Sequence, residues 1–362
     1  MIVPIYKPYE SRHSKKYVNE AVESNWISSQ GKFLDSCKER FKEKFNSDFV
    51  IFTNNGTSAT HLLAIGLKYK HPNIKKLVVP NSVYVAAWNA FKMSTDYEFI
   101  VLPPDLETWN ADFSVLDNLN ISPEDTAFLI VHNVGNIINV PLLKRKYKDF
   151  VFLEDNCEGF TGRYETLYSG KASMAFSVSF FANKTITSGE GGAFVTDDED
   201  LFLYLNSVKN QGVSSKRYVF DKMGYNYRLT NLAAAVLQGQ LEDIDVIKYL
   251  KSETFSNYKR ELATVEEVAL QKVEDDTVHS DWMFAIKLLK SDRELLSNFL
   301  FENGYESRPM FPPMNHHKHY SHVSQCDKAE VLYNQCIMLP SFPTLSKGQV
   351  KQICFLIKEF YK

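Results

Sequence analysis

The chain has 362 residues, which is more than one hydrophobic core usually organises, so we expect a large domain and a smaller one. Hydrophobic residues make up 44% of the chain and charged residues 23%, as in ordinary globular proteins, which argues against intrinsic disorder. Lys and Arg total 41 against 44 Asp and Glu, and no basic tail or stripe is present. The charge pattern therefore gives no reason to expect a nucleic-acid partner.

The cysteines and the N-terminal segment indicate the compartment. No two cysteines form a Cys-x-x-Cys pair, and their odd number and wide spacing are typical of free thiols in a reducing compartment. The first residues lack the basic and apolar regions of a signal peptide, and no apolar window is long enough to span a membrane. We therefore expect a soluble, cytoplasmic protein that does not bind a membrane. The five cysteines are Cys37, Cys157, Cys326, Cys336 and Cys354.

Short apolar runs alternate with longer amphipathic stretches from about residue 49 onward. This alternation predicts an α/β fold, in which helices cover a mostly parallel sheet. In such sheets, ligands bind beyond the carboxyl ends of the strands. The expected strands are residues 49–53, 77–79, 99–102, 127–131, 150–153, 175–180 and 193–196.

The C-terminal third has a different pattern. A long helical pattern begins near Leu229 and runs through residues 232–250, with a break before the next helix, and it could bridge two domains. Two further strands, around 282–288 and 336–339, and two amphipathic helices, near 292–303 and 347–361, predict a smaller α+β domain. We place the domain boundary between residues 1–245 and 246–362.

A turn after the first expected strand has the features of an anion site. Asn54-Asn55-Gly56-Thr57-Ser58 follows residues 49–53, and a helical pattern starts at about Thr57. Free N–H groups and the helix dipole converge at such a helix start, so a phosphate group can bind there. The alternative is structural: Asn-Gly makes a tight turn, and Thr57 or Ser58 only caps the helix.

Carboxylates follow the expected strand at 150–153, in Glu154-Asp155-Asn156-Cys157-Glu158. A carboxylate held against a heterocyclic nitrogen keeps that nitrogen protonated, and Asp155 is the candidate for this role. Its alternative role is to cap the next helix. Cys157 is expected to be a small buried apolar residue rather than a nucleophile.

Lys184 is the candidate with the most specific surroundings. It follows the expected strand at 175–180 and precedes a loop rich in Gly and Thr, a place where a lysine amine can be held partly desolvated and form a Schiff base. Taken alone, Lys184 fits a solvated surface charge better, because that is the role of most lysines. Its combination with the two preceding segments favours a site in which Lys184 forms a Schiff base.

The order of these motifs resembles the DegT/StrS family of sugar-nucleotide aminotransferases. The resemblance covers nearly the whole chain, from Tyr6-Lys7-Pro8 to Leu339-Pro340-Ser341. Its most specific segments are Asn55-Gly56-Thr57, Glu154-Asp155-Asn156-Cys157-Glu158, Ser179-Phe180-Phe181-Ala182-Asn183-Lys184-Thr185-Ile186-Thr187 and Gly224-Tyr225-Asn226-Tyr227-Arg228-Leu229-Thr230-Asn231. Within the family, Trp26-Ile27-Ser28-Ser29-Gln30-Gly31-Lys32 and Glu107-Thr108-Trp109 are most similar to members that aminate C4 of a 4-keto-6-deoxyhexose.

The resemblance implies the fold of aspartate aminotransferase, fold type I of the enzymes that use pyridoxal 5'-phosphate (PLP). It also implies a homodimer with active sites shared between subunits. Lys184 would bind PLP as a Schiff base and act as general acid and base, and Asp155 would pair with the pyridine nitrogen. The resemblance also implies that Glu158 lies near the ring hydroxyl and that Tyr84 stacks on the ring. The implied phosphate contacts are Gly56, Thr57, Ser58 and Ser179 of the same subunit, joined by Asn226 of the partner subunit.

The implied reaction transfers the amino group of L-glutamate to a nucleotide-linked 4-keto-6-deoxyhexose and yields a 4-amino-4,6-dideoxy sugar of the perosamine or viosamine type. Arg308, Lys216 and Arg217 are candidates for holding the pyrophosphate of the sugar nucleotide, and Ser29 is a further substrate candidate.

Two segments depart from the family pattern where the sugar or its surroundings would lie. His132-Asn133-Val134-Gly135 replaces the common His-Leu-Tyr-Gly, and Asn315 replaces a common His. Because of these departures, the identity of the sugar substrate stays open, whereas the type of reaction is not affected. We expect no metal at the nearby His316, His317 and His319, because no carboxylate or Cys accompanies them at a familiar spacing.

Two other functions stay open. The first is a PLP-dependent dehydratase or other lyase on the same fold, although the dehydratases of the family have His where this chain has Lys184. The second is a sensor or scaffold without turnover, against which the intact lysine, aspartate and phosphate turn argue.

Overall fold

The computed structural model describes residues 2–93 and 96–362. Its largest sheet has seven strands in the order β1-β9-β8-β5-β4-β2-β3. The five strands from β8 to β3 run parallel, whereas β9 is antiparallel to both of its neighbours. The expected mostly parallel α/β sheet is therefore confirmed. In the order of the sheet, the strands span Phe49–Thr53, Gly192–Thr196, Ala175–Ser179, Val151–Asp155, Thr126–Val131, Lys76–Pro80 and Glu98–Leu102.

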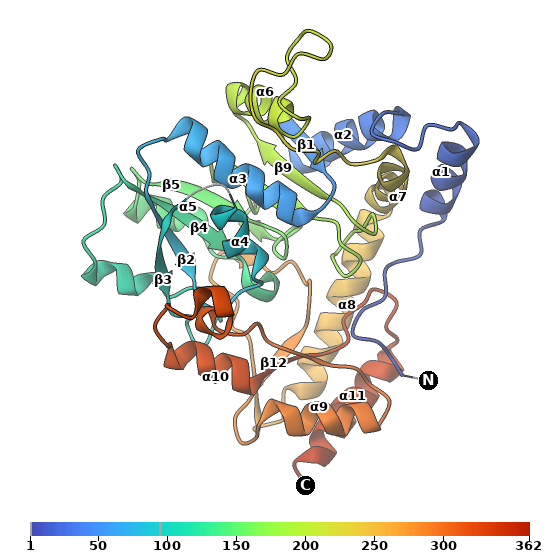
Figure 1. Cartoon of the computed structure of the whole chain (residues 1–362). Helices are drawn as coiled ribbons and strands as arrows, with labels where there is room; N and C mark the ends of the chain where they lie inside the picture. Colours follow the sequence, from blue (N-terminus) through green and yellow to red (C-terminus); the bar gives the residue numbers. More distant parts are fainter. Residues whose placement is uncertain (1, 94–95) are drawn as a thin grey trace.

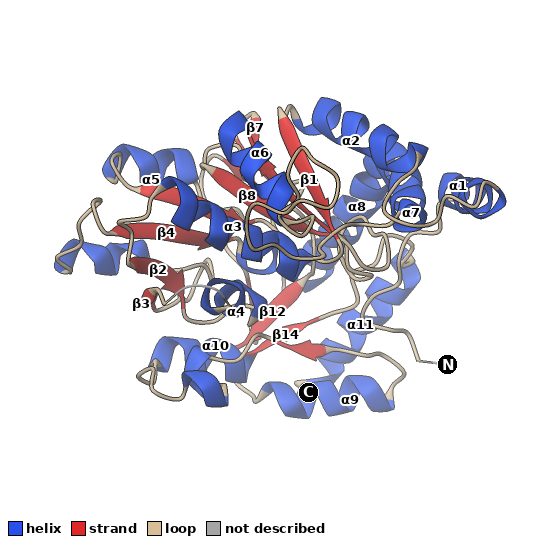
Figure 2. Ribbon diagram, turned by 45° about the horizontal axis from the view of Figure 1, so that its top comes forward, coloured by secondary structure: helices blue, strands red, loops and turns tan. Residues whose placement is uncertain are grey.

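Helices cover both faces of this sheet, so successive residues of one strand pack against opposite layers (Figure 2). In β4, Ala127 and Leu129 pack with α3, while Phe128 and Ile130 pack on the side of α5. This double burial explains why the strands read as continuous apolar runs. The helices α3 (Gly56–Lys70), α4 (Ala86–Lys92) and α6 (Glu199–Val208) lie on one face; α2 (Lys32–Phe45), α5 (Val140–Lys146) and α7 (Asn231–Glu242) cover the other, and α1 (Arg12–Glu23) packs on α7.

The helical pattern over 232–250 folds as two helices rather than one. The first, α7, ends at Glu242, and α8 spans Ile244–Leu262, with Asp243 between them outside helical geometry. Figure 1 shows α8 running from the large sheet to the C-terminal helices. This helix therefore connects the large sheet with the C-terminal part of the chain.

A second sheet of four strands, in the order β10-β12-β14-β13, forms the core of the C-terminal part. The domain boundary near residue 245 coincides with the start of α8 and stays a prediction, because the N-terminal Val3 also bridges to Tyr305. No helix among residues 2–93 and 96–362 is both long and apolar enough to cross a bilayer. The C-terminal strands are Val268–Leu270, Ala285–Leu288, Cys336–Met338 and Arg308–Pro309 in sheet order, and the helices are α9 (Arg293–Glu302), α10 (Asp327–Gln335) and α11 (Lys347–Phe360).

Short elements complete the fold. A small sheet joins β11 (Thr277–Val278), β6 (Arg163–Tyr164) and β7 (Leu167–Tyr168). Four short 3-10 helices span Phe113–Asn118, Asn133–Gly135, Met314–His316 and Lys318–Tyr320.

Lys251, in α8, joins this helix to two other segments. Its side chain is almost fully buried, and Nζ donates to the carbonyls of Trp282 at 2.9 Å and Ser341 at 2.7 Å. Burial lowers the pKa of Lys251 to about 7. The bond to Trp282 lies just before β12, and the strand expected around residues 282–288 begins only at Ala285.

We predict that Lys251→Ala lowers the free energy of unfolding by about 2–4 kcal/mol, because it leaves two buried carbonyls without a donor and opens a cavity. Urea denaturation measures this change. Lys259→Ala is the matched control, since Lys259 is exposed on the same helix. Equal midpoints for the two variants would contradict the role assigned to Lys251.

Candidate active site

A cavity of about 610 Å³ lies beyond the carboxyl ends of β1, β5 and β8. Its volume is in the range of small-molecule sites, and its position is that of ligands in open α/β sheets. The residues from the three sequence motifs meet here, since Gly56, Thr57, Asp155, Glu158, Ser179 and Lys184 all line the cavity.

The turn after β1 fits tightly against the end of β8. Asn55 caps α3, because its Oδ1 accepts from the backbone N–H of Ser58 at 2.8 Å. The cap is thus Asn55 rather than Thr57 or Ser58, and the hydroxyl of Thr57 is not needed for it. A Cβ on Gly56 would lie 2.6 Å from the Cβ of Ser179, so only glycine allows this approach. Free N–H groups of the helix start and the Ser179 side chain therefore lie on one wall of the cavity.

Asp155 ends β5 and is buried. Its Oδ1 accepts from the backbone N–H of Cys157 at 3.1 Å, which fixes the carboxylate in the cavity. No helix starts directly after Asp155, so the alternative capping role is not realised. Burial raises the pKa of the Cys157 thiol well above its ordinary value, as expected for a cysteine that does not act as a nucleophile.

Behind Asp155, the fully buried Glu154 gathers several donors. Its carboxylate accepts from His132 Nε2 at 2.7 Å, from the hydroxyl of Tyr164 and from the N–H of Gly170 at 2.8 Å. Because His132 Nδ1 accepts from the N–H of Ile138, Nε2 carries the proton. Burial alone would raise the pKa of Glu154, but the bonds from His132, Ser173 and Tyr164 hold it below its usual value. This network fixes the end of β5.

The backbone and side chain of Lys184 are held by residues far away in the sequence. The Tyr6 hydroxyl donates to the Lys184 carbonyl at 2.9 Å, and Trp282 Nε1 donates to the Asn183 carbonyl at 2.8 Å. Lys184 Nζ lies 4.1 Å from the centre of the Trp282 ring. Sequence reasoning did not find these roles of Tyr6 and Trp282, although Tyr6 belongs to one of the motifs shared with the family.

Glu158 faces the same amine. Its Oε1 lies 3.9 Å from Lys184 Nζ, and its Oε2 accepts from the N–H of Val134 at 2.9 Å. Val134 has a φ of 58°, a strained value for a β-branched residue, in one of the segments that depart from the family pattern. Burial raises the pKa of Glu158 to about 7, although the nearby Lys184 charge opposes this shift.

The other predicted site residues divide into two groups. Tyr84 and Arg308 line the cavity; the Tyr84 side chain is 59% exposed at its edge, and Arg308 contacts Glu306. Ser58 lies behind the wall as part of α3. Ser29, Lys216, Arg217 and Asn226 do not line this cavity. Their roles toward cofactor and substrate stay predictions.

Two of the three histidines at 316, 317 and 319 contact separate groups, whereas His317 lines the cavity. His316 Nε2 lies 2.7 Å from Glu330, and His319 Nε2 lies 2.9 Å from Asn89 Oδ1. Within the described ranges, no group of three or more His, Cys, Asp or Glu is placed to hold a metal ion.

The raised pKa of Glu158 leads to a prediction for the cofactor-free protein. The folded state retains this proton up to about pH 7, whereas the unfolded chain releases it near its ordinary pKa of 4.5. The associated stability is therefore full below pH 4.5 and lost as the pH rises through 7. Between pH 5 and pH 8, the free energy of unfolding of wild type should fall by about 1–3 kcal/mol relative to that of Glu158→Gln. Urea unfolding at the two pH values measures this difference. Glu39→Gln, at an exposed position, should show no such change. A pH-independent difference between wild type and Glu158→Gln would contradict the assignment.

Comparison with known proteins identifies the family of this chain. The sequence matches the DegT/DnrJ/EryC1/StrS aminotransferase family over residues 8–358. The GDP-perosamine synthase of Escherichia coli O157:H7 is 35% identical over 364 residues, which cover 99% of this chain and 98% of that protein.

Solved structures share the fold. Helicobacter pylori PseC, an aminotransferase involved in the biosynthesis of pseudoaminic acid, has a TM-score of 0.92 at 21% identity, with 100% of this chain and 99% of that chain covered. The E. coli GDP-4-keto-6-deoxy-D-mannose-3-dehydratase with bound hydrated PLP has a TM-score of 0.90 at 19% identity, with 98% and 99% covered. The expected fold class is therefore confirmed, and this chain belongs to the DegT/DnrJ/EryC1/StrS aminotransferase family.

Proposed function

We propose that this protein is a PLP-dependent aminotransferase that converts a nucleotide-linked 4-keto-6-deoxyhexose to the 4-amino-4,6-dideoxy sugar, with L-glutamate as the amino donor. The observation on which this rests is that Lys184, Asp155 and the Gly56–Thr57 turn line one cavity. An amine, a carboxylate and a phosphate-binding turn are the groups that PLP requires.

The residues present fit this cofactor. The turn at Gly56 and the side chain of Ser179 would hold the phosphate, and Asp155 would face the pyridine nitrogen. Asn183 Oδ1 is buried beside Lys184 without a hydrogen-bond partner among the described residues, as expected for a polar atom next to a ligand. With its proton, the carboxyl group of Glu158 would donate a hydrogen bond to the hydroxyl oxygen of the PLP ring. A permanently charged carboxylate would instead repel that oxygen.

When bound, PLP supplies an electron sink for the α-carbon of an amino acid. The chain supplies the proton transfers and the orientation. Lys184 Nζ would move a proton from the α-carbon of the donor to the cofactor and, with the keto sugar bound, from the cofactor to C4 of the sugar. The Trp282 ring would keep this amine directed into the cavity. Asp155 would maintain a positive charge on the ring nitrogen, which stabilises the negative charge that develops during proton transfer.

The similarity to a GDP-perosamine synthase over the full length supports a GDP-linked sugar and amination at C4. Arg308 lines the cavity, and in this proposal its guanidinium group would contact the pyrophosphate of such a substrate. Of the two departures from the family pattern, Val134 contacts the cavity residue Glu158 through its backbone N–H. The choice between perosamine and viosamine stays open.

A homodimer would bring the remaining predicted residues to a site. Asn226 is exposed, and in a shared active site Asn226 of the partner subunit would complete the phosphate contacts. Lys216 and Arg217 are exposed in the loop before it, in a position from which a loop can reach a neighbouring subunit.

We predict that Lys184→Ala loses the visible absorbance of lysine-bound cofactor and at least about 10³-fold in turnover, because both the covalent anchor and the proton-transferring amine are removed. Absorbance spectra and a coupled transamination assay measure the two effects. Lys347→Ala, on the exposed face of α11, serves as the control. Wild-type turnover in Lys184→Ala would refute the assignment.

A panel of GDP-, UDP- and dTDP-linked 4-keto-6-deoxyhexoses with L-glutamate tests the substrate. We expect the GDP-linked sugar to be aminated with a kcat/KM at least about tenfold above the others. Mass spectrometry of the products provides the readout. Loss of water without uptake of nitrogen would favour the dehydratase, and amination of a 3-keto sugar alone would show that the position is wrong.

A further inference from the structure

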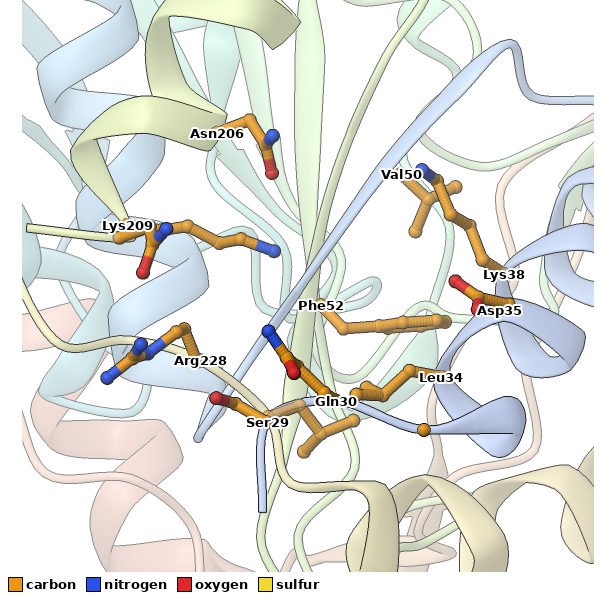
Figure 3. Close-up of a pocket in the computed structure, with 13 residues that line it drawn as sticks. Ser29, Gln30, Leu34, Asp35, Lys38, Val50, Phe52, Asn206, Lys209 and Arg228 are labelled. Carbon is orange, nitrogen blue, oxygen red and sulfur yellow. The ribbon is translucent and has the colours of Figure 1, made fainter. Parts of the chain in front are cut away.

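A second pocket of about 350 Å³ lies outside the cofactor cavity and shares no lining residue with it. It is formed by α2, the free edge of β1 and the C-terminal end of α6, together with the loop around Gln30 and the segment 228–229. Figure 3 shows Lys209 extending toward the interior from the end of α6, with Asp35 and Lys38 on the opposite wall.

Among the polar side chains that line this pocket, hydrogen-bond donors outnumber carboxylates. Three side chains are cationic, those of Lys38, Lys209 and Arg228, whereas Asp35 is the single carboxylate among the lining residues. The neutral polar groups of Ser29, Gln30, Asn206 and Asn210 can also donate. Such a set suits a ligand with several acceptor oxygens and negative charge.

The cations have no counter-ion within the part of the chain that is described. No carboxylate in residues 2–93 and 96–362 forms an ion pair with any of the three. Lys38 Nζ lies 5.4 Å from the centre of the Phe202 ring, and Arg228 Nε donates to Asn226 Oδ1 at 3.0 Å. Burial, together with the positive charges of Lys38 and Arg228, lowers the pKa of Lys209 to about 8. All three cations are partly buried. A partly buried cation without an anionic partner is unfavourable, unless a ligand supplies the negative charge.

We infer that this pocket is a second anion site, which binds the phosphate or diphosphate group of a small molecule through Lys209, Lys38 and Arg228. Its volume is within the range of small-molecule sites, and tetrahedral oxyanions match a shell of ammonium, guanidinium and amide donors.

The position of Arg228 links this site to the turn that faces the cofactor cavity. Arg228 forms a β-bridge with Thr53, and the neighbouring Tyr227 carbonyl accepts from the N–H of Asn54 at 2.9 Å. Asn54 directly precedes Asn55, the cap of α3. The second site therefore lies beside the phosphate turn while remaining separate from it.

The test is isothermal titration of the PLP-loaded enzyme with inorganic phosphate and with pyrophosphate at constant ionic strength. The loaded enzyme is used because an empty cofactor site would itself bind phosphate. We expect wild type to bind at least one of the two anions, Lys209→Met to bind it at least about tenfold more weakly, and Lys209→Arg to bind within about threefold of wild type. Lys347→Met, a surface control, should bind as wild type does.

Thermal unfolding without phosphate provides a second readout, which does not depend on ligand binding by the variant. Lys209→Met should melt at a higher temperature than wild type, because it removes the unpaired charge, and added phosphate should raise the melting temperature of wild type more than that of Lys209→Met. The preferred anion tells whether the ligand carries one phosphate or two. Binding of neither anion to wild type, or equal binding to wild type and Lys209→Met, would overturn the inference.

Discussion

The Lys184 amine lies between the aromatic ring of Trp282 and the carboxyl group of Glu158, and the chemistry of the site depends on this placement. The distances are 4.1 Å to the ring centre and 3.9 Å to the carboxyl oxygen. Neither contact is a tight ion pair, so the amine is directed without being neutralised. An amine held in this way remains available to bind a carbonyl compound and to move a proton.

The surrounding residues fix the positions of that amine and of Asp155 relative to each other. The buried Glu154 fixes the end of β5 through His132, Tyr164 and Gly170, so that the adjacent Asp155 enters the cavity at a defined angle. On the other side, Lys251 holds the carbonyl of Trp282, whose ring faces Lys184. Long-range polar contacts in two separate parts of the chain thus position the groups that act.

The sequence predicted the motifs that lie at strand ends, because strand, turn and helix signals are local. Gly56, Asp155 and Lys184 could be assigned to one edge of the sheet for this reason, and they line one cavity. The order of residues could not show that Tyr6 and Trp282 hold the segment at 183–184, since those contacts join positions far apart in the chain. The pattern over 232–250 predicted one continuous helix with a break only after it, whereas the chain breaks at Asp243, between α7 and α8.

Residues that lie outside the cavity illustrate a second limit. Ser29 lines the donor-rich pocket beside β1, and Asn226, Lys216 and Arg217 lie elsewhere on the same chain. A local motif can indicate that such residues bind an anion, but the subunit and the pocket in which they act depend on packing between distant elements and on assembly.

Transfer of nitrogen from glutamate to C4 of the sugar is the central claim, and isotope labelling tests it most directly. The enzyme is incubated with a GDP-linked 4-keto-6-deoxyhexose and ¹⁵N-labelled L-glutamate, and the product is examined by NMR. The account predicts a ¹⁵N coupling to the carbon and proton at position 4. A product without ¹⁵N, or one with the label at another carbon, would contradict it.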